Sequence, residues 1–190
     1  MITLVTGGAR SGKSNFAERL CMSKSQGAVY VATAQAFDDE MTERIALHKL
    51  QRTQANYPWR NVEEPFQLAK LLSDWRENHL GEANEAPTVL VDCLTIWLSN
   101  ILLSYEGQQD MQEKVKADIL HLVEQVQQYP GHLIMVTNEV GNGIVPEYPL
   151  GRLYRDLAGF MNQAISRCCS EVFLVTAGIP IELKSREYIL

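Results

Sequence analysis

The residues best suited to chemistry form a glycine-rich stretch close to the start of the chain. The segment LVTGGARSGKS fits the pattern G-x-x-x-x-G-K-[ST], with Gly7, Gly12, Lys13 and Ser14 at the fixed positions. Glycines let such a loop turn its N–H groups inward around a phosphate, and the helix that follows adds its positive N-terminal end. Lys13 can reach the β- and γ-phosphates, and the Ser14 hydroxyl can bind Mg²⁺. The motif therefore predicts a nucleoside triphosphate site.

An acidic partner for the metal is available further along the chain. Asp92 ends the apolar run TVLVD, which is the usual place for a carboxylate that faces Mg²⁺. Aspartate also favours the N-cap position, and a helix is expected to begin at Leu94. Asp92 can fill either role, or both together.

A histidine lies within a charged segment, DDEMTERIALHKLQR, that spans Asp38 to Arg52. If this segment is helical, Arg44, His48 and Arg52 share a face, because they are four residues apart. The two guanidinium groups would attract phosphate and disfavour the protonated form of the imidazole. A neutral imidazole is a nucleophile, so His48 is a candidate for covalent catalysis. The alternative is a surface histidine on a charged helix.

Alternating apolar runs and helix-like patterns position these residues. Short runs rich in β-branched residues predict strands over residues 2–6, 28–33, 59–62, 88–92, 132–137, 172–176 and 179–183. Helical periodicity predicts helices over residues 13–22, 38–52, 66–79, 94–103, 111–128 and 150–168. Strands that are apolar throughout are buried on both faces, and alternation with helices makes them parallel. The fold class is therefore a three-layer α/β sandwich with a mostly parallel sheet, which gathers ligands at the carboxyl ends of its strands.

Two of the expected helices carry clear core-facing stripes, in which apolar residues recur every three or four positions. The first stripe consists of Val115, Ile119, Leu122, Val123 and Val126. The second consists of Leu153, Leu157, Phe160, Met161, Ala164 and Ile165.

Length and composition limit the class of protein. The 190 residues suffice for one compact domain over residues 1–190, with 46% hydrophobic and 21% charged residues. The net charge of −6 disfavours a nucleic-acid partner. No apolar stretch approaches the ~20 residues of a membrane span, and no signal peptide is recognised, so we expect a cytoplasmic protein. The four cysteines form no C-x-x-C pair, which favours buried free thiols over zinc ligands.

Several long motifs together resemble one known family, the bifunctional adenosylcobinamide kinase/adenosylcobinamide-phosphate guanylyltransferases of cobalamin synthesis. LVTGGARSGKS is similar to the family's opening, and DDEMTERIALHK is similar to its segment D-D-E-M-x-x-R-I-x-x-H. VTNEVGNGIVPE followed by GRLYRDLAGFMNQ resembles its C-terminal signature, and VTAGIPIEL resembles its final strand and turn. The match runs through the whole chain in order, which makes it far more specific than the glycine-rich loop alone.

The resemblance implies a RecA-like P-loop fold and two reactions. ATP or GTP phosphorylates the aminopropanol hydroxyl of adenosylcobinamide, and GMP from GTP is then transferred to that phosphate with release of pyrophosphate. The family's GMP-carrying histidine maps to His48. Its nucleotide contacts map to Gly7, Gly8, Ala9, Arg10, Ser11, Gly12, Lys13, Ser14, Thr33, Ala34, Gln35, Lys49, Leu50, Gln51, Arg52, Glu63 and Asp92. Several members of the family have glutamate at this position, and the side chain of Asp92 is shorter than glutamate by one methylene group.

Two other interpretations fit the same glycine-rich loop. A P-loop kinase for another small metabolite would use Lys13 and Asp92 but not His48. A nucleotide-dependent switch would bind the nucleotide without transferring a phosphoryl or nucleotidyl group. The segment TNEVG (Thr137–Gly141) is expected to line the active cleft, or to form a turn in which Asn138 acts as a cap. The family also suggests a homo-oligomer, with a trimer as the expected form.

Overall fold

The computed structural model describes residues 1–35, 56–78 and 86–189. The strands are β1 (Ile2–Gly7), β2 (Ala28–Ala32), β3 (Trp59–Glu63), β4 (Val89–Asp92), β5 (Leu133–Val136), β6 (Glu171–Thr176) and β7 (Ile179–Glu182). The helices are α1 (Lys13–Lys24), α3 (Leu68–Asn78), α4 (Leu94–Ser104), α5 (Met111–Gln128) and α6 (Pro149–Cys168), with short 3₁₀ turns at Val140–Asn142 and Lys184–Arg186. Each element expected within the described residues is present, with small shifts at its ends. The helix expected over residues 38–52 lies outside them.

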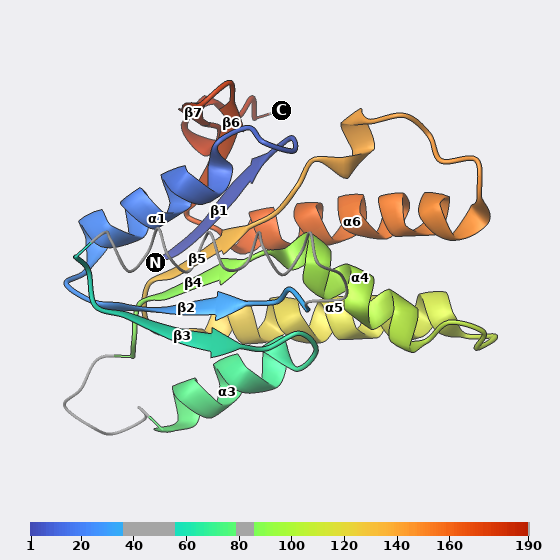
Figure 1. The fold of residues 1–190 in the computed structure, drawn as a ribbon, viewed down its shortest axis with the longest axis horizontal. Coiled ribbons are helices and arrows are strands. Elements are labelled where there is room, and N and C mark those ends of the chain that lie inside the picture. The colour runs from blue at the N-terminus through green and yellow to red at the C-terminus, as the bar shows by residue number, and fades with distance from the viewer. Residues whose placement is uncertain (36–55, 79–85, 190) are drawn as a thin grey trace.

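The strands form a single seven-stranded sheet in the order β3-β2-β4-β5-β1-β6-β7 (Figure 1). Every neighbouring pair is parallel except β6 and β7. Strand β5 thus lies between β1, which leads into the glycine-rich loop, and β4, which ends at Asp92. The predicted α/β class with a mostly parallel sheet is confirmed.

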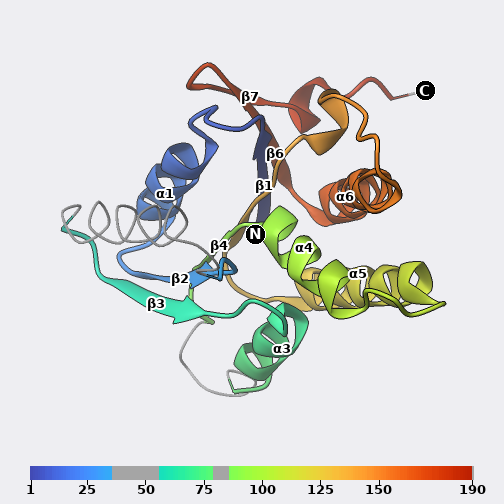
Figure 2. The same ribbon diagram turned by 45° about the vertical axis from the view of Figure 1, so that its right-hand side comes forward.

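Helices cover both faces of the sheet, which makes three layers (Figure 2). Helix α1 lies on one face, whereas α3, α4, α5 and α6 lie on the other. Successive residues of a strand serve opposite faces: Val89 and Val91 belong to the core on the side of α3–α6, and Leu90 belongs to the core beneath α1. This double burial explains why the strands read as continuous apolar runs.

The predicted stripe of α5 faces the core, with Val115, Ile119, Leu122 and Val126 fully buried. In α6 the prediction is wrong at one position. Phe160 is 36% exposed, whereas Ala158 is buried beside Leu157. The buried face of α6 therefore passes through Leu157 and Ala158, and Phe160 lies at its exposed edge.

The last strand reverses direction in a tight hairpin. Ala177 and Gly178 connect β6 to β7 with φ angles of 51° and 78°. Positive φ at both central positions is typical of a type I′ turn, whose twist matches that of antiparallel strands. The hairpin therefore ends the sheet with its one antiparallel edge in the described part of the chain.

Three of the four cysteines, Cys21, Cys93 and Cys169, are buried free thiols, as predicted. Burial raises the pKa of both Cys21 and Cys169 to about 12, so these two thiols stay neutral. Among the helices of the described residues, none has the length and apolar character that crossing a membrane requires.

Candidate active site

The glycine-rich loop joins β1 to α1 at the carboxyl edge of the sheet. Gly12 stands at the N-cap of α1 with a φ of 92°, a left-handed conformation that favours glycine. Lys13 begins the helix and is 8% exposed, and its Nζ donates to the carbonyl oxygen of Gly8 at 3.1 Å. The lysine charge is thus turned back over the loop, as a phosphate cradle requires.

The final hairpin supports this loop from the side. The N–H of Gly178 donates to the carbonyl oxygen of Ser11 at 2.9 Å. A Cβ built on Gly12 would lie 3.3 Å from the Cα of Gly178, so the two backbones are in close contact. This role of the β6–β7 turn was not predicted from the sequence, because the two segments are distant along the chain.

The first glycine of the motif has a steric requirement that can be tested. A Cβ on Gly7 would lie 2.4 Å from the carbonyl oxygen of Val175, a backbone atom of β6. Gly7→Ala is therefore expected to lower the free energy of unfolding by about 1–3 kcal/mol, the range for overpacked sites. Gly8→Ala is the matched control, since its Cβ would meet nothing within 4 Å. Equal urea-unfolding midpoints for the two variants would contradict this account of Gly7.

The register of the strands aligns the predicted polar residues along one edge. Ala32 pairs with Glu63 on one side and with Asp92 on the other. Asp92 in turn pairs with Val136, which pairs with Val5, two residues before the loop begins. Glu63 and Asp92 therefore end their strands level with one another. Only β5 separates Asp92 from β1, whereas β2, β4 and β5 all lie between Glu63 and β1.

Asp92 is held by its neighbours rather than by the helix that follows. Its Oδ2 accepts a hydrogen bond from the Tyr30 hydroxyl at 3.0 Å. The N-cap of α4 is Cys93, and no side-chain capping bond is present there. The alternative role of Asp92 as a helix cap is therefore wrong, and its carboxylate remains a candidate for metal or nucleotide contact.

The charges of the loop and of β4 lie near each other. Burial raises the pKa of the Cys93 thiol, the adjacent Asp92 charge raises it further, and the Lys13 charge acts in the opposite direction. Helix α1, which begins at Lys13, also packs against β4, the strand that ends at Asp92. The sheet thus brings the predicted lysine and carboxylate to one place.

Thr33 has a mainly structural role in this structure. Its side chain is fully buried, and its Oγ1 donates to the Cys93 carbonyl at 2.8 Å and accepts from the Cys93 N–H at 2.9 Å. Its own N–H donates to the Asp92 carbonyl at 3.2 Å. Thr33 thereby fixes the ends of β2 and β4 together, and the half-buried Ala34 and Gln35 continue from it at the same edge.

The segment Thr137–Gly141 connects the loop to α4 and α6. Thr6 Oγ1 donates to a carboxylate oxygen of Glu139, and the Glu139 N–H donates to the Gly7 carbonyl at 3.2 Å. Asn138 Nδ2 donates to Thr95 Oγ1 at 2.8 Å. The 3₁₀ turn that follows has no side-chain cap, so a capping role for Asn138 is wrong. Glu139 belongs to the segment predicted to line the cleft, but its contacts with Thr6 and Gly7 were not predicted individually.

The structure thus places Gly7–Ser14, Thr33–Gln35 and Asp92 along the carboxyl edge of the sheet, with Glu63 at the same edge but on the outer strand β3. The other predicted site residues, His48 and Lys49–Arg52, lie outside the described residues. Their roles stay predictions.

Comparison with known proteins agrees with the motifs. The family model described as cobinamide kinase / cobinamide phosphate guanyltransferase matches residues 3–183. The bifunctional adenosylcobalamin biosynthesis protein CobP of Pseudomonas aeruginosa is 42% identical over 184 residues, which cover 97% of this chain and 98% of the relative. Two proteins of the same description named CobU, from Escherichia coli and Salmonella typhimurium, are 40% and 39% identical and cover 97% of this chain and 100% of each relative. The chain belongs to the cobinamide kinase / cobinamide phosphate guanyltransferase family.

Proposed function

We propose that this chain phosphorylates the aminopropanol hydroxyl of adenosylcobinamide with ATP or GTP and then transfers GMP from GTP to the new phosphate. The observation that carries the proposal is the cradle itself: Lys13 is folded over Gly8, at the start of a helix that packs against β4, in a chain that matches the family over residues 3–183. A kinase for another metabolite or a nucleotide switch would share the cradle but not the family match.

The kinase step needs a held triphosphate and compensation of its negative charge. The N–H groups of the loop and the start of α1 would bind the phosphates, and Lys13 would stabilise the charge that develops on the transferred group. The acceptor hydroxyl attacks the γ-phosphorus, the bond to the β-phosphate oxygen breaks, and the nucleoside diphosphate leaves. The hydroxyl proton passes to a base or to water.

The oxygen donors at this edge fit Mg²⁺. Ser14 offers a hydroxyl and Asp92 a carboxylate oriented by Tyr30, and Mg²⁺ in nucleotide sites takes few protein oxygens, together with phosphates and waters. Bound there, the ion would neutralise phosphate charge and orient the group that is transferred.

In the guanylyl transfer, His48 is the proposed nucleophile. A ring nitrogen forms a bond to the α-phosphorus of GTP, while the bond between that phosphorus and the bridging oxygen to the β-phosphate breaks and pyrophosphate leaves. An oxygen of adenosylcobinamide phosphate then attacks the same phosphorus and displaces the imidazole. The intermediate divides one difficult transfer into two easier ones.

Incubation with α-labelled GTP and Mg²⁺ tests this proposal. Labelled protein whose label is lost in acid and kept in base is the expected result, because phosphoramidates have that stability. No label on the protein, together with normal turnover, would contradict a covalent histidine intermediate.

Asp92→Asn is expected to weaken the response to Mg²⁺ while leaving the fold intact. The amide keeps the hydrogen bond from Tyr30 but loses the negative charge that attracts the cation. The Mg²⁺ concentration for half-maximal kinase activity should rise by about tenfold, the scale of one lost charge contact. Asp74→Asn on exposed α3 is the control. Unchanged activity with an unchanged metal response would remove Asp92 from the site.

The resemblance also supports three coarser proposals. We propose a single catalytic domain over residues 1–190, a homo-oligomer such as a trimer, and a cytoplasmic location.

A further inference from the structure

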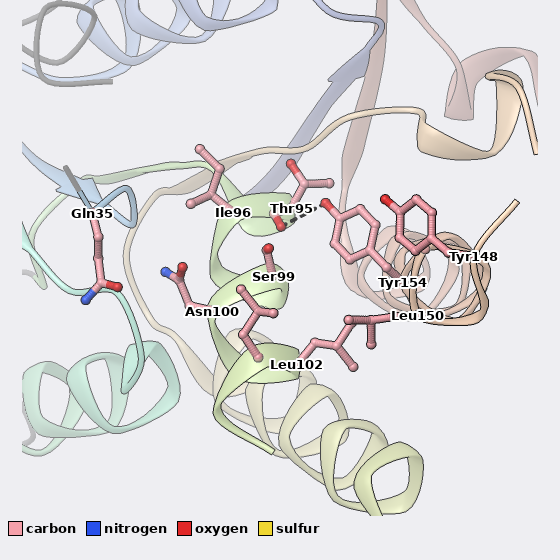
Figure 3. Close-up of a pocket in the computed structure, with 11 residues that line it drawn as sticks. Gln35, Thr95, Ile96, Ser99, Asn100, Leu102, Tyr148, Leu150 and Tyr154 are labelled. Carbon is pink, nitrogen blue, oxygen red and sulfur yellow. Dashed lines mark hydrogen bonds between the residues drawn. The ribbon is translucent and has the colours of Figure 1, made fainter. Parts of the chain in front are cut away.

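A second recess, distinct from the phosphate cradle, lies along α4. Its volume is about 460 Å³, within the usual range for small-molecule sites. Figure 3 shows the side chains of α4 between Gln35 on one side and Tyr148, Leu150 and Tyr154 of the α6 region on the other. None of its described lining residues carries a formal charge. A recess of this kind is unsuited to phosphate and suited to a neutral ligand.

This pocket is joined to the catalytic edge at its Thr95 end. Thr95 lies three residues after Asp92 and accepts a hydrogen bond from Asn138, in the segment that contacts the cradle. The Tyr154 hydroxyl donates to the Thr95 carbonyl at 3.0 Å, which ties α6 to the start of α4. A ligand in the pocket would therefore lie beside the end of β4, where the transferred phosphate is proposed to be.

The opposite wall reaches the same edge of the sheet. Gln35 lines the pocket and follows Thr33 by two residues, and Thr33 is bonded to the backbone of Asp92 and Cys93. Asn100 is 4% exposed and donates to the carbonyl oxygens of Thr33 and Pro65. This buried amide fixes the wall of the pocket against the end of β2, so the pocket is part of a preformed structure.

The pocket combines apolar surface with a few neutral polar groups. Ile96, Leu102 and Leu150 supply apolar walls, and Ser99 supplies a hydroxyl. At the pocket, Leu103 is 48% and Tyr148 is 64% exposed, so large apolar groups are open to solvent there. Exposed apolar groups next to a recess are typical of a ligand site that continues onto the surface.

We infer that this pocket holds the neutral amide-bearing arm of cobinamide that ends in the aminopropanol hydroxyl, with the adjoining edge of the corrin ring. The inference rests on the proposed function, because it assigns the acceptor's place in that reaction. The arm is uncharged and carries an amide and a hydroxyl, and the ring edge is rich in methyl and amide groups. A whole corrinoid is larger than the pocket, so the rest of the ring would lie over Leu103 and Tyr148. Both reactions act at the end of the same arm, so one acceptor site serves both.

Two substitutions test the assignment by different routes. Ser99→Phe would fill the pocket from α4, and the KM for adenosylcobinamide in the ATP-dependent kinase assay is expected to rise by about tenfold or more. Tyr148→Ala removes an exposed aromatic contact without disturbing the core, and a rise of about threefold or more is expected. Ser23→Phe on exposed α1 and Tyr188→Ala near the C-terminus are the matched controls. The Kd for ATP, measured without acceptor, should change by less than about twofold in every variant.

The outcomes separate this inference from the proposed function. A raised acceptor KM in both pocket variants, with the Kd for ATP unchanged, supports it. If both variants are active and their KM for adenosylcobinamide is unchanged, the inference is overturned. It is also overturned if the Kd for ATP rises together with the KM, because the pocket would then bind the nucleobase of the nucleotide. A wild-type protein that phosphorylates no adenosylcobinamide would overturn the proposed function first, and the inference with it.

Discussion

Lys13→Ala is expected to slow both the phosphorylation of adenosylcobinamide and the transfer of GMP by about 10²–10³-fold, the effect of removing one preorganised charge-stabilising group. Both reactions need a triphosphate held in the same cradle, and Lys13 is the cation folded over it. Kinase turnover and protein labelling by α-labelled GTP measure the two reactions separately.

The control for this variant is Lys24→Ala, at the far end of the same helix. Lys24 is the last residue of α1 and lies 3.9 Å from the Glu171 carboxylate. Its removal changes the net charge of α1 equally, so normal activity in Lys24→Ala would assign the loss to the site. Normal kinase turnover in Lys13→Ala would contradict a shared cradle. A melting temperature close to that of the wild type would show that the loss is not due to unfolding.

His48→Ala is expected to abolish covalent labelling by α-labelled GTP and to stop the transfer of GMP. Phosphorylation of adenosylcobinamide should survive at least in part, because direct in-line transfer of a γ-phosphate needs no histidine nucleophile. Alanine is a better helix former than histidine, so an expected helix position should tolerate it. The separation of the two activities is the distinctive result, since Lys13→Ala impairs both.

His121→Ala is the matched control for the histidine. His121 is an exposed residue of α5 and lies 3.8 Å from the Glu124 carboxylate of the same helix. Labelling should persist in that variant. Labelled GMP that persists on His48→Ala would remove His48 as the nucleophile, and His79 and His132 would then be tested in turn.

Local sequence patterns were sufficient to predict much of the fold and the phosphate cradle. The loop from Gly7 to Ser14 was recognised because its glycines and lysine have fixed spacing, and the strands were recognised because both of their faces are buried. Asp92 was assigned to the right strand end, since a carboxylate after a buried run is itself a local signal.

The remaining features depend on contacts between distant segments. Gly178 supports the cradle through Ser11, more than 160 positions away, and no local pattern indicates such a contact. The burial of Thr33 against Cys93 depends on the pairing of β2 with β4. Phe160 was wrongly assigned to the core because helical spacing gives the apolar stripe but not how far the helix is rotated against its neighbours.

The claim that one chain carries out both reactions is tested most directly by the origin of the phosphates in the product. Wild-type protein is incubated with adenosylcobinamide, γ-labelled ATP and GTP labelled at the α-phosphate with a second isotope, and the corrinoid product is isolated. The account predicts adenosylcobinamide-GDP that carries both labels, one from each reaction, with the γ-label below the α-label to the extent that GTP serves as the phosphoryl donor. A product that carries only the γ-label would contradict it in favour of a kinase alone, and nucleotide hydrolysis with no label on the corrinoid would contradict both transfer reactions.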